Sequence, residues 1–118
     1  MDDTLHSAPS VIFHDREQLW DLCHKASQGA SQGEALMAVS ARHLHGSLGV
    51  GWFYGLSSRV REHFPDVPLL LVLDCDEHVG HALRALRLGL AVRVRIQGDT
   101  ARLRAVADCW GGTLIEDN

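Results

Sequence analysis

Short apolar runs alternate along this chain with longer segments in which apolar residues recur every three or four positions. The runs at 11–13, 35–39 and 69–73 contain no polar residue, which is typical of buried strands. The run at 69–73, LLLVL, predicts a central strand that is covered by helices on both faces. Between these runs, the three- and four-residue spacing predicts helices that each bury one face.

Capping and stop residues mark the boundaries of the predicted helices. Asp15 with Gln18, and Asp74 with Glu77, have the spacing of a capping box, in which side-chain oxygens accept from the free amides of the first turn. We therefore expect one helix after Asp15 and another after Asp74, with a third between them that follows a loop at 42–49. The residues that end these helices are Gly29, Pro65 and Gly89.

A fourth strand is predicted at 92–96, where the pattern changes. Its apolar residues alternate with Arg93 and Arg95, so one face of the strand is expected to be exposed to solvent. This alternation favours a strand that lies near an edge of the sheet or faces a partner.

The last helix and strand follow directly. Asp99 or Thr100 can cap a helix that ends near Gly111, and we expect the apolar residues of this helix, Trp110 among them, to point inward. A final short strand is predicted at 113–115.

Five strands that alternate with four helices predict an α/β fold with a mostly parallel sheet and right-handed crossovers. An open, Rossmann-like sheet of the flavodoxin or receiver type is our first interpretation. The alternative is half of a (βα) barrel that closes by dimerisation. We expect residues 1–10 to be a polar lead-in and residues 11–118 to form one domain.

Composition narrows the function classes. The chain has 118 residues, 11 basic and 15 acidic side chains and a formal charge of −4, and it has no basic run, which argues against a nucleic-acid partner. No apolar run approaches the roughly 20 residues of a membrane span. The polar, acidic start lacks the pattern of a signal peptide, and three cysteines do not make a disulfide framework. We therefore expect a cytoplasmic protein.

Ligands of open parallel sheets bind beyond the carboxyl ends of the strands, where helices begin. This rule nominates ligand-binding candidates by position: His14, Ser40, Asp74, Asp76, Gln97 and Gly98.

A glycine-rich loop at 46–51 opens the second predicted helix and adds three candidates. Gly49, Gly51 and Trp52 lie where backbone amides can cradle an anion. The loop matches neither the dinucleotide-binding nor the P-loop glycine pattern. The alternative is that these glycines serve turn geometry and close packing.

The run Asp74-Cys75-Asp76 places two carboxylates and a thiol after the central strand. Asp74 could act as a general base or a metal ligand, and Cys75 as a nucleophile if the helix dipole lowers its pKa. Helix capping by a carboxylate explains the same pattern without a ligand, and we favour that interpretation.

Eight histidines are many for this length, and two pairs have ligand-like spacing: His43 with His45, and His78 with His81. A zinc site needs three or four ligands that converge, and the sequence does not show convergence. We therefore predict no metal, keep these four histidines as candidates, and assign no cofactor.

The segment from Asp66 to Asp108 resembles the second half of a two-component receiver domain, without that family's active-site residues: Gln97-Gly98 stands where a Lys-Pro pair is expected. The same pattern is similar to a βαβ unit of a phosphate-binding barrel. The motifs Gly51-Trp52-Phe53 and Leu73-Asp74-Cys75 resemble those of a group of small uncharacterised bacterial α/β proteins. That resemblance implies no activity, but it implies that the two motifs face a shared pocket.

Two functions are compatible with these patterns. The first is a non-catalytic regulatory domain that binds a small anionic metabolite in the strand-end crevice and forms a homodimer. The alternative is a small lyase or hydrolase that uses Asp74 and Cys75, or a histidine-bound metal. Whether the chain is an enzyme stays open at this point.

Overall fold

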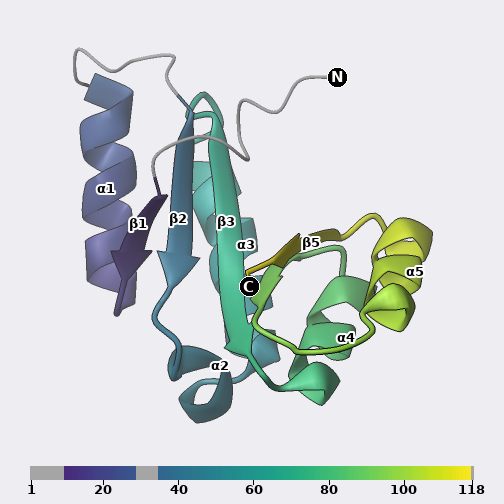
Figure 1. Cartoon of the computed structure of the whole chain (residues 1–118). Helices are drawn as coiled ribbons and strands as arrows, with labels where there is room; N and C mark the ends of the chain where they lie inside the picture. The colour runs from purple at the N-terminus through teal and green to yellow at the C-terminus, as the bar shows by residue number, and fades with distance from the viewer. Residues whose placement is uncertain (1–9, 29–34, 118) are drawn as a thin grey trace.

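The computed structural model describes residues 10–28 and 35–117 (Figure 1). The predicted lead-in at 1–10 lies outside these residues apart from Ser10, which begins the first strand, and so does the expected helix stop at Gly29. The elements in chain order are β1 (Ser10–Phe13), α1 (Arg16–Gln28), β2 (Leu36–Ser40), α2 (Leu44–Ser47), α3 (Val50–His63), β3 (Leu69–Asp76), α4 (Val79–Arg87), β4 (Ala91–Val94), α5 (Ala101–Trp110) and β5 (Thr113–Glu116).

The five strands form one sheet in which every neighbouring pair is parallel. This confirms the predicted α/β fold with a five-stranded parallel sheet flanked by helices, and the architecture is consistent with a flavodoxin-like one. The strand order is sequential, from β1 to β5, and β3 is the central strand, as predicted. Because the order does not reverse within this sheet, strand order alone does not mark a binding crevice, and the site has to be found from its residues.

The helices pack against one face of the sheet. A large buried cluster joins alternate strand residues such as Phe13, Leu73 and Val92 to helix residues such as Phe53 and Leu86. The intervening strand residues form a second, smaller buried cluster made of Met37, Val39, Val72 and Ala91, to which no helix contributes a buried residue. Sequential parallel strands with right-handed crossovers place their helices on the same side, which accounts for this division.

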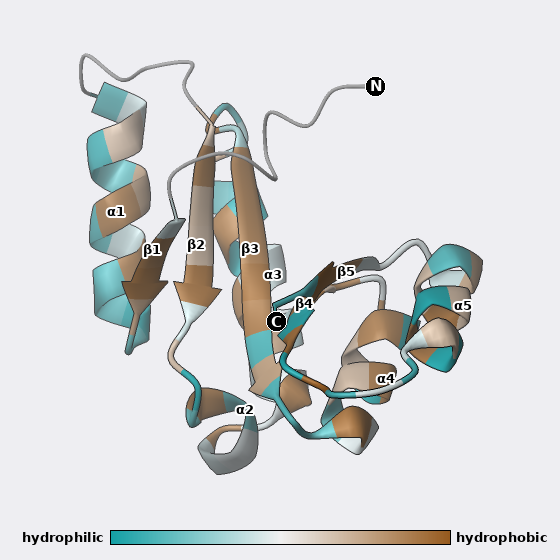
Figure 2. Ribbon diagram, viewed as in Figure 1, coloured by the Kyte–Doolittle hydropathy of each residue, from teal (hydrophilic) through white to brown (hydrophobic). Residues whose placement is uncertain are grey.

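The polarity of β3 changes along its length. Figure 2 shows an apolar strand with a hydrophilic band near its carboxyl end. Leu71, Val72 and Leu73 are almost completely buried. The expectation that helices cover both faces of this strand is wrong, because Leu71 and Leu73 pack against helices whereas Val72 lies in the second cluster, whose described residues all belong to strands. Asp74 follows them in the same strand and is also buried, at 3% exposure. Since a buried charge must be paired, this end of β3 is where a functional site is expected.

One of the predicted capping boxes is confirmed and the other is wrong. The amide of Gln18 donates to Asp15 Oδ1 at 2.8 Å, and Gln18 Oε1 accepts from the amide of His14 at 2.7 Å. At the second box, β3 continues to Asp76, and α4 begins at Val79 after an N-cap residue that makes no side-chain capping bond. Asp74 is therefore a strand residue and does not cap α4.

Two further expectations are corrected at helix ends. The loop predicted at 42–49 contains a single helical turn, α2, with Leu44 buried beneath it. Trp110, expected to point inward, exposes 60% of its surface because it is the last residue of α5, and Gly111 turns the chain away at φ 72°. Thr100 is the N-cap residue of α5 but makes no side-chain capping bond, whereas Oδ1 of the preceding Asp99 accepts from the amide of Ala101 at 2.8 Å. Among the described helices, none combines the length and the apolar character needed to cross a membrane.

Candidate functional site

A partly buried ion pair joins the carboxyl ends of β3 and β4. Arg95 Nη1 donates to both carboxylate oxygens of Asp74, at 2.9 Å each. The same guanidinium lies 3.5 Å from Asp76 Oδ1 and, through Nε, 3.3 Å from Asp117 Oδ2. Three carboxylates thus surround one arginine, of which Asp74 is buried and the other two are partly exposed.

An irregularity in the sheet holds this cluster in place. The register of β3 against β4 shifts between Asp74 and Asp76, as in a β-bulge. Asp76 adopts a left-handed backbone conformation at φ 53°, and its carbonyl accepts from the amide of Arg95 at 2.8 Å. The amide of Asp74 donates to Ser40 Oγ at 3.0 Å, and the amide of Asp76 donates to Asp74 Oδ1 at 2.9 Å. Bulges often re-aim side chains beside binding sites, and this one directs two carboxylates at Arg95.

The electrostatics keep Arg95 charged. Burial lowers the pKa of its guanidinium, but the hydrogen bond and charge of Asp74, followed by the charges of Asp117 and Asp76, outweigh this effect and raise the pKa. A lone buried charge costs several kcal/mol, so Asp74 and Arg95 depend on each other for stability.

A cleft of about 820 Å³ opens beside this ion pair, beyond the carboxyl ends of β4 and β5. Two of the predicted ligand-binding residues, Gln97 and Gly98, line it. Arg95 contributes the positive charge of the cleft, against three carboxylates. The complete lining is Glu77, Arg95, Ile96, Gln97, Gly98, Glu116 and Asp117.

Three histidines gather close to the same end of β3. His45 of α2 is buried at 5% exposure, and its ring centroid lies 4.7 Å from that of His78 and 4.9 Å from that of His81. The Nδ1 atoms of His45 and His81 are 2.6 Å apart. Burial, then the charges of His78 and His81, lowers the pKa of His45, so this ring is neutral at pH 7. His43, the predicted partner of His45, is exposed at the N-cap of α2.

The thiol of Cys75 lies on the opposite side of β3 from Asp74. It is fully buried within the helix-packed cluster. Burial, aided by the charge of Asp74, raises its pKa to about 12. A thiol with this pKa is protonated at pH 7 and inaccessible to a substrate, so the structure gives no support to Cys75 as a nucleophile.

The glycine-rich loop leads to a different part of the molecule. Gly51 and Trp52 line a small cavity of about 250 Å³, which they share with Arg16 of α1 and Arg59 of α3. Gly49 serves as the N-cap of α3 with φ 89°. The two motifs expected to face one pocket therefore contribute to different places, since Asp74 contacts Arg95 in the cleft beyond β4.

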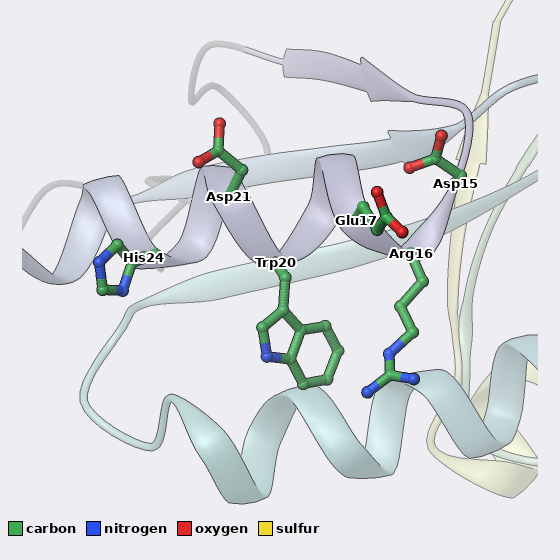
Figure 3. Close-up of a pocket in the computed structure, with 6 residues that line it drawn as sticks. All are labelled: Asp15, Arg16, Glu17, Trp20, Asp21 and His24. Atoms are coloured by element: carbon green, nitrogen blue, oxygen red, sulfur yellow. The ribbon is translucent and has the colours of Figure 1, made fainter.

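A third hollow follows the outer surface of α1 and has a volume of about 750 Å³ (Figure 3). Trp20 and Arg16 project from α1 toward the neighbouring helix, and the guanidinium of Arg16 lies 4.9 Å from the centre of the Trp20 ring. His14, at the end of β1, is exposed and bonds to Gln18. All six residues that line this hollow belong to α1 or its cap, and none of them is buried. It is a groove along one helix and a weaker candidate than the cleft.

Sequence reasoning missed the residue that organises the site, Arg95. The available signal was the alternation of Arg93 and Arg95 with apolar residues in the fourth strand, which puts both arginines on the same side of the sheet as Asp74. Glu77 was expected in the first turn of the helix after Asp74, and Glu116 and Asp117 follow the last predicted strand, so none of the three was nominated as part of the cleft.

Comparison of the chain with protein-family models and with curated proteins finds no match. The function is therefore argued from the site itself.

Proposed function

We propose that this chain is a non-catalytic regulatory domain that binds a small polar molecule in the cleft at the carboxyl ends of β3, β4 and β5. The observation that carries the proposal is the position of the Arg95 guanidinium. It lines a cleft of about 820 Å³, and two hydrogen bonds to Asp74 fix its orientation. A rigid charged group with an open, polar surrounding is what a small-molecule site needs for orientation and specificity.

The charges in the cleft refine the class of ligand. The sequence predicts a small anionic metabolite, and Arg95 with the Gln97 amide suits an anionic group. Three carboxylates also line the cleft: Asp117 is paired with Arg95 at 3.3 Å and Glu116 with Arg104 at 2.7 Å, whereas Glu77 is exposed. We therefore favour a small zwitterion, whose anionic end faces Arg95 and whose cationic end faces Glu77.

A catalytic role has less support at this cleft. Both carboxylate oxygens of Asp74 are bonded to Arg95 and the side chain is buried, so it is not open to a substrate, and Cys75 is buried with a pKa of about 12. The predicted lyase or hydrolase would need another reactive group, and the best remaining candidates are the histidines beside β3.

Thermal unfolding with three matched sets of small molecules tests the proposal. The sets are monocarboxylates, monoamines and amino acids of similar size. A ligand at 100 times its Kd adds about 2.7 kcal/mol to the free energy of unfolding, which corresponds to a Tm increase of at least about 5 °C. We expect hits among the amino acids, and no hit in any set would refute the proposal.

A charge-neutral variant then locates the ligand. Glu77→Gln removes one exposed carboxylate from the cleft, and we expect it to raise the Kd of a hit about two- to fivefold. Glu62→Gln makes the same change on the exposed face of α3, away from the cleft, and should leave the Kd unchanged. Equal effects of the two variants would mean that the ligand binds elsewhere.

We also propose a cytoplasmic location and a homodimer. The three cysteines are free, and Cys109 is exposed, which suits a reducing compartment. An interface through α5 is supported by the exposed residue Trp110, whose backbone carbonyl lies close to Gly89, the residue that follows the exposed Leu88. Light scattering of the wild type and of Trp110→Ser tests this surface, since a dimer that becomes a monomer is the expected result.

A further inference from the structure

Three imidazoles from separate parts of the chain converge beside the cleft. His45 comes from α2, His78 is the N-cap residue of α4, and His81 lies on the first turn of α4. The three ring centroids are 4.7, 4.9 and 5.6 Å apart. His45 is buried, His81 is half-buried and His78 is exposed, so the group is open to solvent on one side.

The contact between His45 and His81 constrains what lies between them. Their Nδ1 atoms are 2.6 Å apart. Two lone pairs at this distance repel each other, and so do two N–H groups, so one Nδ1 carries a hydrogen and donates it to the lone pair of the other. Both nitrogens thus face the same point, and a metal ion can occupy it once the donating ring carries its hydrogen on Nε2 instead.

We propose that His45, His78 and His81 bind a divalent first-row transition metal ion, with Zn²⁺ as the reference case. Neutral imidazole is the common protein ligand of such ions, and a three-histidine set leaves one position open to water or to a ligand.

Metal binding requires a small rearrangement of the rings. As the described side chains are placed, no group of three His, Cys, Asp or Glu residues has the geometry to hold a metal ion. Two nitrogens on a tetrahedral Zn²⁺, with Zn–N of about 2.0–2.1 Å, lie about 3.3 Å apart, so the pair must open by about 0.7 Å. Rotation of the His81 and His78 side chains, which border solvent, can supply this change while His45 stays fixed.

This site does not depend on the small-molecule proposal, because none of the three histidines lines the cleft. The two proposals can therefore fail separately. A metal ion held here would add a positive charge close to Asp74 and Asp76. Because both carboxylates bond to Arg95, this charge would change the electrostatics of the arginine and so the affinity of the cleft for its ligand.

Calorimetric titration with Zn²⁺ tests the site directly, on untagged protein that has been stripped with a chelator. We expect one ion per chain for the wild type. His78→Gln and His81→Gln should each weaken binding at least about tenfold, because even changes in residues that only support a ligand cost roughly 10–100-fold. His43→Gln is the matched control, since it removes an exposed imidazole two positions from His45 and should leave the affinity unchanged.

Co²⁺ in place of Zn²⁺ gives a second measurement that does not depend on affinity alone. Intense visible absorption bands, of the kind that tetrahedral Co²⁺ gives, are expected for the wild type and for His43→Gln, and their loss is expected in His78→Gln. Absence of Zn²⁺ binding by the wild type, or equal binding by His43→Gln and His78→Gln, would overturn the proposal. If His81→Gln fails to fold by circular dichroism, His78→Gln decides the question, because its side chain is exposed.

Discussion

The cleft beyond β4 and the small cavity between α1 and α3 both contain arginines, but the two regions hold them differently. Arg95 in the cleft donates to a buried carboxylate at 2.9 Å and is 24% exposed. Arg16 and Arg59 in the cavity are exposed, beside glycines that leave open space. Removing an ion pair from water has a desolvation cost, and the pair in turn fixes the position of the arginine. We place the function at the cleft because its arginine is fixed in this way and the arginines of the cavity are not.

Removal of Arg95 should have the largest effect. Arg95→Met leaves the Asp74 carboxylate buried without its partner, and we expect the free energy of unfolding to fall by about 3 kcal/mol. Urea unfolding at pH 7 measures the change. The double variant Asp74→Asn with Arg95→Met should recover much of the loss, because it removes the uncompensated charge.

Arg93→Met provides the comparison for this experiment. The Arg93 Nε lies 3.9 Å from a carboxylate of Asp117 that is 45% exposed, so its loss should cost less than about 1 kcal/mol. If Arg93→Met lowered the free energy of unfolding as much as Arg95→Met, the ion pair between Asp74 and Arg95 would not be the interaction that stabilises the carboxyl ends of β3 and β4.

Ser40 is expected to have an intermediate effect, although it carries no charge. Ser40→Ala removes the acceptor of the Asp74 amide in a buried setting, which should cost about 1–3 kcal/mol in urea unfolding. Ser58→Ala is the control, since the exposed Ser58 hydroxyl only donates to a carbonyl of its own helix and its loss should be close to neutral. Similar values for the two variants would contradict a structural role of Ser40 at the site.

The sequence predicted the elements well because hydrophobic periodicity is a local signal. All five strands and the four long helices are where the apolar runs and spacing place them. The role of Asp74 was not predictable in the same way. The capping pattern with Glu77 is local, whereas the partner that Asp74 has in the fold lies 21 residues away and depends on a bulge in the register of β3 and β4.

The histidines show the same limit. Local spacing paired His43 with His45 and His78 with His81, but the short helix α2, which the sequence did not predict, turns His45 inward and leaves His43 in solvent. Convergence of His45 with the α4 pair is a tertiary contact across 36 positions of the chain. A local spacing rule cannot distinguish it from the other histidine pairs in the chain.

The smallest expected effect lies in the cavity between α1 and α3, and it has the opposite sign. Gly55 lies inside α3, and a Cβ at this position would meet no atom within 4 Å. Gly55→Ala should therefore raise the free energy of unfolding by about 0.5–1 kcal/mol, since alanine loses less backbone entropy in a helix. Gly112→Ala is the contrast, because its Cβ would lie 3.0 Å from the Leu90 carbonyl oxygen, and it should destabilise the fold. A destabilising effect of Gly55→Ala would contradict this expectation. It would indicate that the cavity beside Arg59 requires a glycine at this position, and the cavity would then be a second candidate for the binding site.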